Sequence, residues 1–438
     1  MKKTILSITW FAAICFISIA PGYAEPTSEE VGAVVQGNRL FAHDLYGQLA
    51  GQEGNLFFSP YSISTALGMT YAGARGQTET EMTAVLHFPL SQDRFHPAMG
   101  GLISSINSPE RTGYTLRVAN RLWGQQGTDF EPYFLDTTRQ YYGAGLAEVD
   151  YKFHTEDARQ TINRWVEDQT EQKIRNLIPE GVLSRNTRLV LTNAIYFLGD
   201  WKHSFNESAT RDRSFHLDAT ETVSVPTMRQ TSRFRYMETD DFQLLDLPYE
   251  NDDLSMLLLL PRERDGLSSF EASFSDELLQ ESIDQMRYVD VSVTLPNFTM
   301  TQDFELKDTL VEMGMASPFA DAADFSGISS ESELKISKVI HKAFIQVDEQ
   351  GTEAAAATAV IVGITSTSIP RPPEIFSADH PFAFLIRDNR TDSILFMGRV
   401  MEPQWDEAAA VPEPASWMLA LLGILPMVAA RRRRRRAR

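Results

Sequence analysis

The residue types that usually carry out catalysis form no recognisable site in this sequence. The chain of 438 residues has eight scattered histidines, none at the spacing of metal ligands, and one cysteine, Cys15. It contains no His-Glu-x-x-His, Gly-x-Ser-x-Gly, P-loop or dinucleotide-binding motif. The acidic pair Asp252-Asp253 lacks the pattern of a calcium loop and is typical of a solvated loop. We therefore expect no catalytic residue, no metal, no cofactor and no enzymatic activity.

One stretch nevertheless has a composition suited to a particular task, and it runs from Glu349 to Ser366. It reads E-Q-G-T-E-A-A-A-A-T-A-V-I-V-G-I-T-S and lies between a predicted strand at 336–347 and the proline-rich run 370–373. Alanine favours helices, so a flexible linker or a short surface helix is one interpretation. As a strand, it would turn only small or β-branched side chains to one face, at Thr352, Ala354, Ala356, Thr358, Val360 and Val362. Such a segment could enter a sheet without a clash.

The elements around this stretch predict one α+β domain over residues 25–402. Strands are expected at 114–123, 188–197, 234–238, 243–248, 254–260, 289–294, 336–347, 382–387 and 393–400. Helices are expected at 31–50, 61–72, 78–87, 94–106, 157–173 and 306–313. No regular alternation of strand and helix orders them, and no repeat or linker divides them.

The first 24 residues predict a secretory signal peptide. Lys2 and Lys3 precede an apolar run at 5–20, and small residues lead up to a cleavage site after Ala24. Ile14 is too large to precede a lipoprotein cysteine, so we expect no lipid on Cys15. Removal of this segment on export would leave a chain without cysteine, and therefore without disulfides.

The opposite end carries a second targeting pattern. The motif Pro412-Glu413-Pro414 precedes a 15-residue apolar run and six consecutive arginines, 431–436. The run is shorter than the ~20 residues of a full membrane span, and the arginines would hold this end in the cytoplasm. A plain membrane anchor is one interpretation.

The order of these features at 411–438 resembles the PEP-CTERM sorting signal of Gram-negative bacteria, with 403–410 as a linker. The resemblance implies an exosortase as processing partner, transient membrane insertion of the tail and then its removal. It further implies a product in the extracellular space, the outer envelope or the exopolysaccharide matrix.

The body between the two ends is strongly acidic. Nine basic residues lie in the terminal segments, namely Lys2, Lys3 and the arginines at 431–436 and 438. Subtracting these nine from 40 leaves 31 basic against 59 acidic residues, a net charge of −28. We therefore expect no binding of the body to nucleic acid, and we expect a monomer.

Four motifs of the body together resemble the serpin family of serine protease inhibitors, and the resemblance covers 30–403. They are N-L-F-F-S-P-Y-S-I at 55–63, L-T-N-A-I-Y-F-L-G-D-W at 191–201, and the segments 342–358 and 380–400. The resemblance implies three β-sheets, eight or nine helices, an exposed reactive-centre loop at about 349–374 and a metastable native state. It also implies a suicide inhibitor: a serine protease cleaves the loop, and the loop inserts into the main sheet with the acyl-enzyme attached.

The resemblance assigns a hinge and a reactive bond within the loop. The hinge consists of Glu349, Gly351, Thr352, Glu353, Ala354, Ala355, Ala356, Ala357 and Thr358. The reactive bond is Thr365–Ser366, and Ile364, Ser366 and Thr367 remain alternative positions for the cut. These residues favour elastase-like or subtilisin-like targets. The small hinge residues favour an inhibitor; the alternative is a non-inhibitory serpin-fold binding or matrix protein.

The resemblance also assigns a polar cluster called the shutter, beneath the point where the sheet opens, to Ser59, Ser62, Asn193 and His341. It places Trp201 at the breach, where insertion begins. Without the resemblance, His341 has a second interpretation as a buried core histidine whose hydrogen bonds are satisfied. Trp201 has a second interpretation as an ordinary core aromatic residue. Asn297 stands where relatives often have a lysine, so Glu349 is expected to lack an ion pair and the sheet to open modestly more easily, since an exposed pair is worth only ~0–1 kcal/mol.

Overall fold

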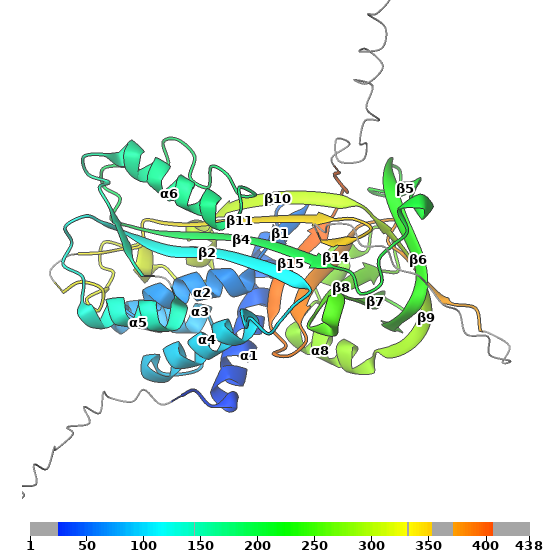
Figure 1. Ribbon diagram of the computed structural model, residues 1–438, viewed down its shortest axis with the longest axis horizontal. Coiled ribbons are helices and arrows are strands. Elements are labelled where there is room, and N and C mark those ends of the chain that lie inside the picture. Colours follow the sequence, from blue (N-terminus) through cyan, green and yellow to red (C-terminus); the bar gives the residue numbers. More distant parts are fainter. Residues whose placement is uncertain (1–24, 144, 331–332, 353–370, 406–438) are drawn as a thin grey trace, which may run out of the picture.

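The structure is a computed structural model that describes residues 25–143, 145–330, 333–352 and 371–405. Helices cover both faces of a six-stranded sheet, which adjoins a nine-stranded sheet (Figure 1). The described ranges contain nine α-helices: α1 Ser28–Leu49, α2 Pro60–Tyr71, α3 Gly76–Val85, α4 Gln92–Ile106, α5 Pro132–Tyr142, α6 Thr155–Gln169, α7 Leu267–Glu271, α8 Asp276–Gln285 and α9 Lys307–Glu312. None of these nine is long and apolar enough to cross a membrane. The predicted α+β class is confirmed.

The six-stranded sheet positions the candidate site. Its strands, in spatial order, are β10 Phe298–Glu305, β11 Lys338–Val347, β12 Gly351–Thr352, β4 Leu189–Asp200, β2 Tyr114–Gln125 and β3 Ala147–Val149. The apolar run that predicts a buried strand at 188–197 forms most of β4, which is buried continuously from residue 189 to 197. A strand buried on both faces needs apolar side chains at nearly every position.

Alternate residues of β4 face two different hydrophobic clusters, because successive side chains of a strand point to opposite faces. Val190 and Ala194 pack with the residues of α6, while Leu191 and Ile195 pack in the main core that includes α2. Figure 1 shows α6 on one side of the sheet and α2 on the other. By this alternation Asn193 faces the α2 side.

The nine-stranded sheet combines the two further sheets that the resemblance predicts. Its main path is β1 Leu56–Phe58, β15 Ile394–Val400, β14 Phe382–Asp388, β8 Leu254–Pro261, β7 Phe242–Pro248, β6 Thr222–Glu238, β9 Arg287–Pro296 and β13 Glu374–Ser377. One end of the 17-residue β6 pairs with β5, Arg211–His216, and the other end pairs with β7. Because β6 pairs with different strands at its two ends, it joins the two expected sheets into one continuous hydrogen-bonded sheet.

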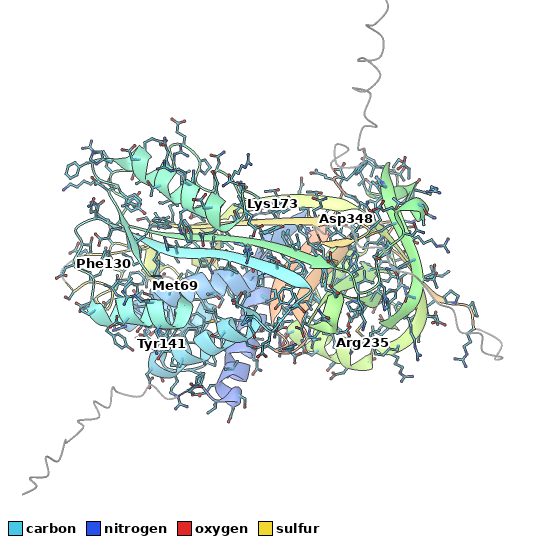
Figure 2. The ribbon with its side chains drawn as sticks, in the orientation of Figure 1. Met69, Phe130, Tyr141, Lys173, Arg235 and Asp348 are labelled. Atoms are coloured by element: carbon cyan, nitrogen blue, oxygen red, sulfur yellow. The ribbon has the colours of Figure 1, made fainter. Side chains whose placement is uncertain are left out.

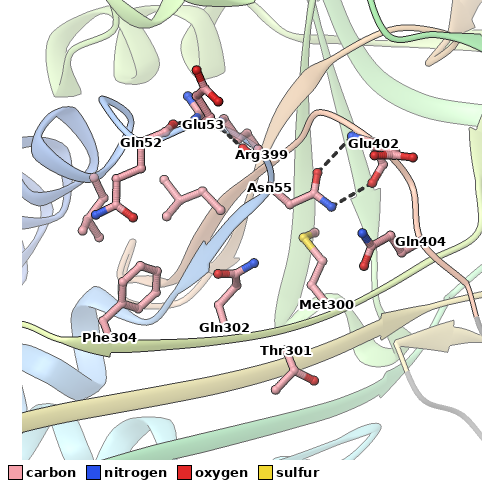
Figure 3. Close-up of a pocket in the computed structure, with 13 residues that line it drawn as sticks. Gln52, Glu53, Asn55, Met300, Thr301, Gln302, Phe304, Arg399, Glu402 and Gln404 are labelled. Atoms are coloured by element: carbon pink, nitrogen blue, oxygen red, sulfur yellow. Dashed lines mark hydrogen bonds between the residues drawn. The ribbon is translucent and has the colours of Figure 1, made fainter. Parts of the chain in front are cut away.

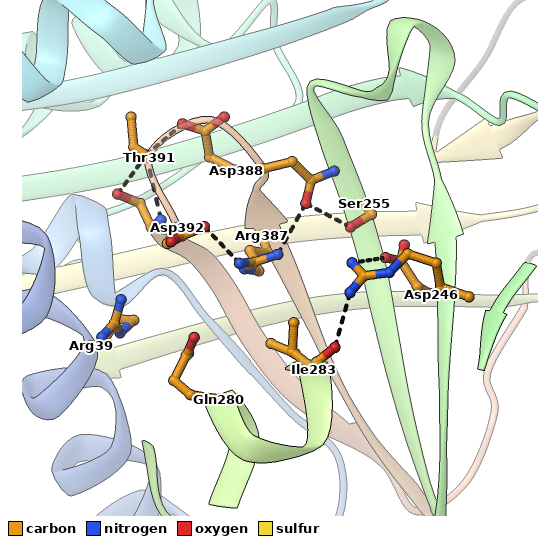
Figure 4. A network of polar contacts seen from close by, with 12 residues as sticks. Arg39, Asp246, Ser255, Gln280, Ile283, Arg387, Asp388, Thr391 and Asp392 are labelled. Atoms are coloured by element: carbon orange, nitrogen blue, oxygen red, sulfur yellow. Dashed lines mark hydrogen bonds and ion pairs between the residues drawn. The ribbon is translucent and has the colours of Figure 1, made fainter. Parts of the chain in front are cut away.

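Charged side chains connect β6 of this sheet to α8 and brace the turn between β14 and β15 (Figure 4). Arg235 donates to the Ile283 carbonyl oxygen at 2.9 Å and pairs with Asp246 at 3.4 Å. Arg387 pairs with Asp392 at 2.6 Å across the turn between β14 and β15. Burial raises the pKa of the Asp246 carboxyl, and the neighbouring Arg235 opposes this shift. The sheet is thus held by ionic contacts in addition to its apolar core.

Candidate functional site

The candidate site is the seam between β4 and β11, which is closed along part of its length. The two strands pair in parallel from Val190–Lys338 to Tyr196–Phe344. Beyond that point, β12 lies between them and pairs antiparallel with both. Gly351 and Thr352, from the predicted hinge, thus form a short strand inside the sheet.

A tight turn brings the chain from β11 into β12. The Asp348 carboxylate accepts hydrogen bonds from the backbone N–H groups of Gln350 at 3.0 Å and Gly351 at 3.2 Å. Burial raises the pKa of this carboxyl, and the two amides oppose the shift. A Cβ at Gly351 would lie 2.1 Å from the Gly199 carbonyl oxygen, so glycine permits the close approach of β12 to β4. Figure 2 shows Asp348 at the end of the sheet that adjoins the nine-stranded sheet.

Neutral side chains hold the carboxylate of Glu349, which is buried in the turn. Its Oε1 accepts a hydrogen bond from Asn297 Nδ2 at 3.1 Å and another from the Thr210 hydroxyl. The Glu349 carbonyl oxygen accepts from the Phe205 N–H at 2.7 Å. Asn297, which stands where the resemblance predicts a lysine, therefore still contacts the hinge glutamate but contributes no charge.

Two aromatic residues enclose the hinge. Trp201 Nε1 donates to the Asp348 carbonyl oxygen at 3.0 Å, and the Trp201 N–H donates to the Gln350 carbonyl oxygen at 2.8 Å. The indole stacks on Tyr249, with ring centroids 4.6 Å apart and an interplanar angle of 12°. The Tyr249 hydroxyl lies 2.7 Å from Thr352 Oγ1, and burial raises the pKa of this phenol well above its ordinary value.

The predicted shutter residues come together where the seam is closed. His341 on β11 is in register with Asn193 on β4, which is in register with Asn120 on β2. Ser59 and Ser62 approach this row from the start of α2, where the Ser59 hydroxyl caps the helix by accepting from the Ser62 N–H at 3.1 Å. All of these side chains are buried.

Hydrogen bonds join the shutter into one network. Asn193 Nδ2 donates to Ser62 Oγ and to Asn120 Oδ1, both at 2.6 Å. Ser62 Oγ donates to Asn120 Oδ1 at 3.1 Å, and Asn120 Nδ2 returns a hydrogen bond to the Ser62 carbonyl oxygen at 3.1 Å. Ser59 Oγ donates to the Leu395 carbonyl oxygen at 2.6 Å, which connects the network to β15. The cluster thus spans both sheets.

His341 closes the seam as a neutral imidazole. The Ser59 N–H donates to His341 Nε2 at 3.1 Å, so Nε2 accepts and the proton lies on Nδ1, which contacts Asn193 Oδ1. Complete burial lowers the pKa of His341 to about 3. A second ring proton would point at the Ser59 N–H, so the closed seam requires the neutral form. The His341–Asn193 contact must break before another strand can enter here.

The end of the described chain is fastened away from the seam, beside a pocket of about 250 Å³ (Figure 3). Asn55 Oδ1 accepts from the backbone N–H of Met401 at 2.7 Å and of Glu402 at 3.0 Å, and its Nδ2 donates to the Glu402 carbonyl oxygen at 2.7 Å. The Thr299 N–H donates to the Gln404 carbonyl oxygen at 2.6 Å. Residues up to 404 thus belong to the folded body.

Comparisons with known proteins agree with this architecture. The family model described as "Serpin (serine protease inhibitor)" matches residues 36–403. The chain belongs to the serpin family. An uncharacterised serpin-like protein of Thermococcus kodakarensis is 44% identical over 371 residues, covering 85% of this chain and 86% of that protein. The leukocyte elastase inhibitor of Sus scrofa is 42% identical over 376 residues, covering 84% and 98%. The crystal structure of uncleaved ovalbumin matches with a TM-score of 0.76 at 30% identity, covering 85% of this chain and all of ovalbumin.

The structure describes only part of the serpin site that the sequence predicts. Glu349, Gly351 and Thr352 lie at the end of the seam that β12 occupies, where Trp201 holds the same turn through the backbone of Asp348 and Gln350, and the four shutter residues meet at the closed part. The rest of the predicted hinge and the reactive bond lie outside the described residues, namely Glu353, Ala354, Ala355, Ala356, Ala357, Thr358, Thr365 and Ser366. The signal peptide and the sorting motif, Pro412, Glu413 and Pro414, also lie outside them.

Three residues of the site are not among those predicted from the sequence. Asn120 completes the shutter, and its signal is a buried polar residue in the middle of the strand predicted at 114–123. Tyr249 and Thr210 contact the hinge from regions far away in the sequence. No local pattern distinguishes these two from an ordinary core tyrosine and an ordinary loop threonine.

Proposed function

We propose that this serpin is an exported suicide inhibitor of serine proteases, with a metastable native state. The observation that carries the proposal is the placement of β12. The hinge enters the sheet at the point where β4 and β11 separate, so a longer insertion would extend a strand that is present before cleavage. At alternate positions after Thr352 the sequence has small residues, Ala354, Ala356 and Thr358, and a strand that inserted with these side chains on its inner face would fit against the core without a clash.

The proposed reaction stops halfway through proteolysis. The serine oxygen of the protease attacks the carbonyl carbon of Thr365, an ester forms, and the peptide bond breaks to release the amino group of Ser366. The loop on the ester side then inserts along the seam and carries the attached protease with it. Hydrolysis of the ester is prevented when the distorted protease can no longer activate water. The cut at Ile364, Ser366 or Thr367 would follow the same chemistry.

Insertion replaces one strand pairing with two. The seven residue pairs between Lys338–Phe344 and Val190–Tyr196 must separate, while an inserted strand pairs with both β4 and β11. Each added hydrogen bond contributes ~1 kcal/mol net, so a full-length inserted strand favours the cleaved form.

The target class we propose is elastase-like or subtilisin-like. Thr365 has a small side chain that suits a shallow protease pocket, and the matched relative from Sus scrofa is named a leukocyte elastase inhibitor. The test mixes the protein with pancreatic elastase or subtilisin and looks for a covalent complex that survives SDS. Clean cleavage without such a complex would favour the alternative, a non-inhibitory binding or matrix protein.

A substitution that introduces a charge into the seam can distinguish covalent trapping of the protease from simple cleavage of the loop. Thr352 is fully buried, so Thr352→Arg would place a cation where the strand must sit and should abolish the covalent complex while leaving cleavage intact. Thr231→Arg makes the same change at an exposed position of β6 and should leave complex formation unchanged.

We further propose that residues 1–24 direct export and that the tail at 411–438 directs exosortase processing after transient membrane insertion. Support comes from the residue order at the two ends and from the secure attachment of the body up to residue 404 by Asn55 and its neighbours. Mass spectrometry of the exported protein should find neither the signal peptide nor the arginine cluster. An exported product that retains the arginines would contradict the sorting proposal without affecting the inhibitory one.

A further inference from the structure

The hydroxyl of Tyr249 makes one hydrogen bond in the described part of the structure, and its partner is Thr352 in the hinge. Both Tyr249 and Thr352 are fully buried, and their hydroxyl oxygens are 2.7 Å apart. Within the described residues, Thr352 is the only hydrogen-bond partner of this phenol. If Thr352 left the sheet, the phenol would lose its partner in a buried position, which is unfavourable.

The ring of Tyr249 is held so that its hydroxyl points at one place. Trp201 stacks on one face at 4.6 Å between centroids, and Phe197 packs edge-on at 5.1 Å with an angle of 79°. Trp201 in turn is tied to the turn of the hinge through its indole N–H and its backbone N–H. The phenol is therefore positioned by the same groups that surround the hinge.

We propose that Tyr249 is a positioning residue that latches the hinge: its hydroxyl keeps Thr352 seated between β4 and β11 before any cleavage. Insertion then starts from an existing strand, and the entropy of placing its first residue is already lost. Without the latch, the hinge would spend part of its time outside the sheet. Its functional consequence rests on the proposed inhibitory function, since delayed insertion gives the protease time to hydrolyse the ester.

Hydrogen exchange tests the latch without any protease. In Tyr249→Phe and in Thr352→Val, we expect the amides of 350–352 to exchange about tenfold faster than in the wild type, which is the effect of losing one hydrogen bond on the opening equilibrium. Because both variants remove the same hydrogen bond, the double variant should exchange no faster than either single variant. Thr352→Ser keeps the hydroxyl and should exchange like the wild type.

Two further variants bracket the measurement. Tyr71→Phe is the matched control, because the Tyr71 hydroxyl also pairs with a threonine, accepting from Thr83 at 3.1 Å, but far from the hinge. It should leave the exchange of 350–352 unchanged. Gly351→Ala forces a Cβ against the Gly199 carbonyl oxygen and should expel β12, which defines the signal of an unseated hinge.

The consequence for trapping is measured as the number of inhibitor molecules consumed per protease molecule trapped. Tyr249→Phe should raise this number severalfold with elastase or subtilisin, and Tyr71→Phe should not. A wild type that traps no protease would refute the proposed function, yet the exchange result would still decide whether the latch exists. Unchanged exchange in Tyr249→Phe, or additive effects in the double variant, would overturn the latch.

Discussion

The seam between β4 and β11 and the nine-stranded sheet are held together by different chemistry. Neutral hydrogen bonds between His341, Asn193 and their neighbours close the seam. The nine-stranded sheet is fastened by buried charges: Arg111 makes a bidentate pair with Asp388 at 2.6 and 3.2 Å, with side chains 2% and 0% exposed. Separating such a pair is far more costly than exchanging one neutral hydrogen bond for another. The proposed insertion would therefore open the seam and leave the nine-stranded sheet intact.

The largest expected loss of stability follows from breaking the buried Arg111–Asp388 pair at the nine-stranded sheet. Arg111→Met removes one partner of a buried ion pair and leaves the Asp388 carboxylate uncompensated, which should destabilise the native state by about 3–5 kcal/mol. Guanidinium unfolding followed by tryptophan fluorescence measures it. Arg139→Met removes a pair whose side chains are 68% and 70% exposed and should leave the midpoint nearly unchanged. Equal shifts in the two variants would contradict the assigned role of the buried pair.

The next largest effect is the loss of stability at low pH that is caused by His341 in the closed seam. The pKa of His341 is lowered from 6.5 to about 3 by burial, so between these values the unfolded chain binds a proton that the native chain does not. Stability should therefore rise with pH through this window and be lost as the pH falls from 6.5 towards 3. At pH 5 the loss from this residue is about 2 kcal/mol.

The dependence of unfolding free energy on pH isolates this contribution. His96, whose pKa burial also lowers to about 3, should add a similar slope. His341→Gln should remove about 1.4 kcal/mol per pH unit from the slope between pH 4 and 6. His154→Gln, at a side chain 66% exposed, is the surface control. An unchanged slope in His341→Gln would mean that the shutter does not exclude the proton.

The smallest expected effect is seen when two N-cap serines, Ser59 and Ser275, are each replaced by alanine. Ser59→Ala and Ser275→Ala each remove an N-cap, of α2 and α8 respectively, and loss of the cap should cost about 1 kcal/mol in each. Only Ser59 also donates to the Leu395 carbonyl oxygen beneath the seam. Hydrogen exchange along β4 and β11 should therefore accelerate in Ser59→Ala alone. Equal acceleration in both variants would show that the seam responds to global stability and not to the shutter.

The sequence predicts the elements with strong patterns and misses those with weak ones. The apolar run at 188–197 and the Ser59–Pro60 helix start correspond to β4 and α2. The helix α8 is missed because few of its residues are apolar and buried, chiefly Leu279 and Ile283. Helix α5 and strands β5 and β10 are also missed. The first half of β6 is missed because its exposed residues are polar and Pro226 interrupts the run.

The candidate site, too, is predicted from the sequence only in part. Motifs locate the shutter and the hinge along the chain, but they do not give the register that sets Asn120 beside Asn193. Nor do they show that Tyr249, about a hundred positions before Thr352, ends against it. Both contacts depend on how distant strands align. That alignment is determined by the packing of the whole domain and not by the residues nearby in sequence.

In the proposed mechanism, the seam opens to admit the cleaved loop. The most direct measurement compares the unfolding of the intact protein with that of the protein cut once near Thr365 by a catalytic amount of protease. We expect the cut chain to unfold at a markedly higher temperature and denaturant concentration, because the loop would have become a strand between β4 and β11. A cut chain that unfolds at or below the midpoint of the intact protein would contradict it.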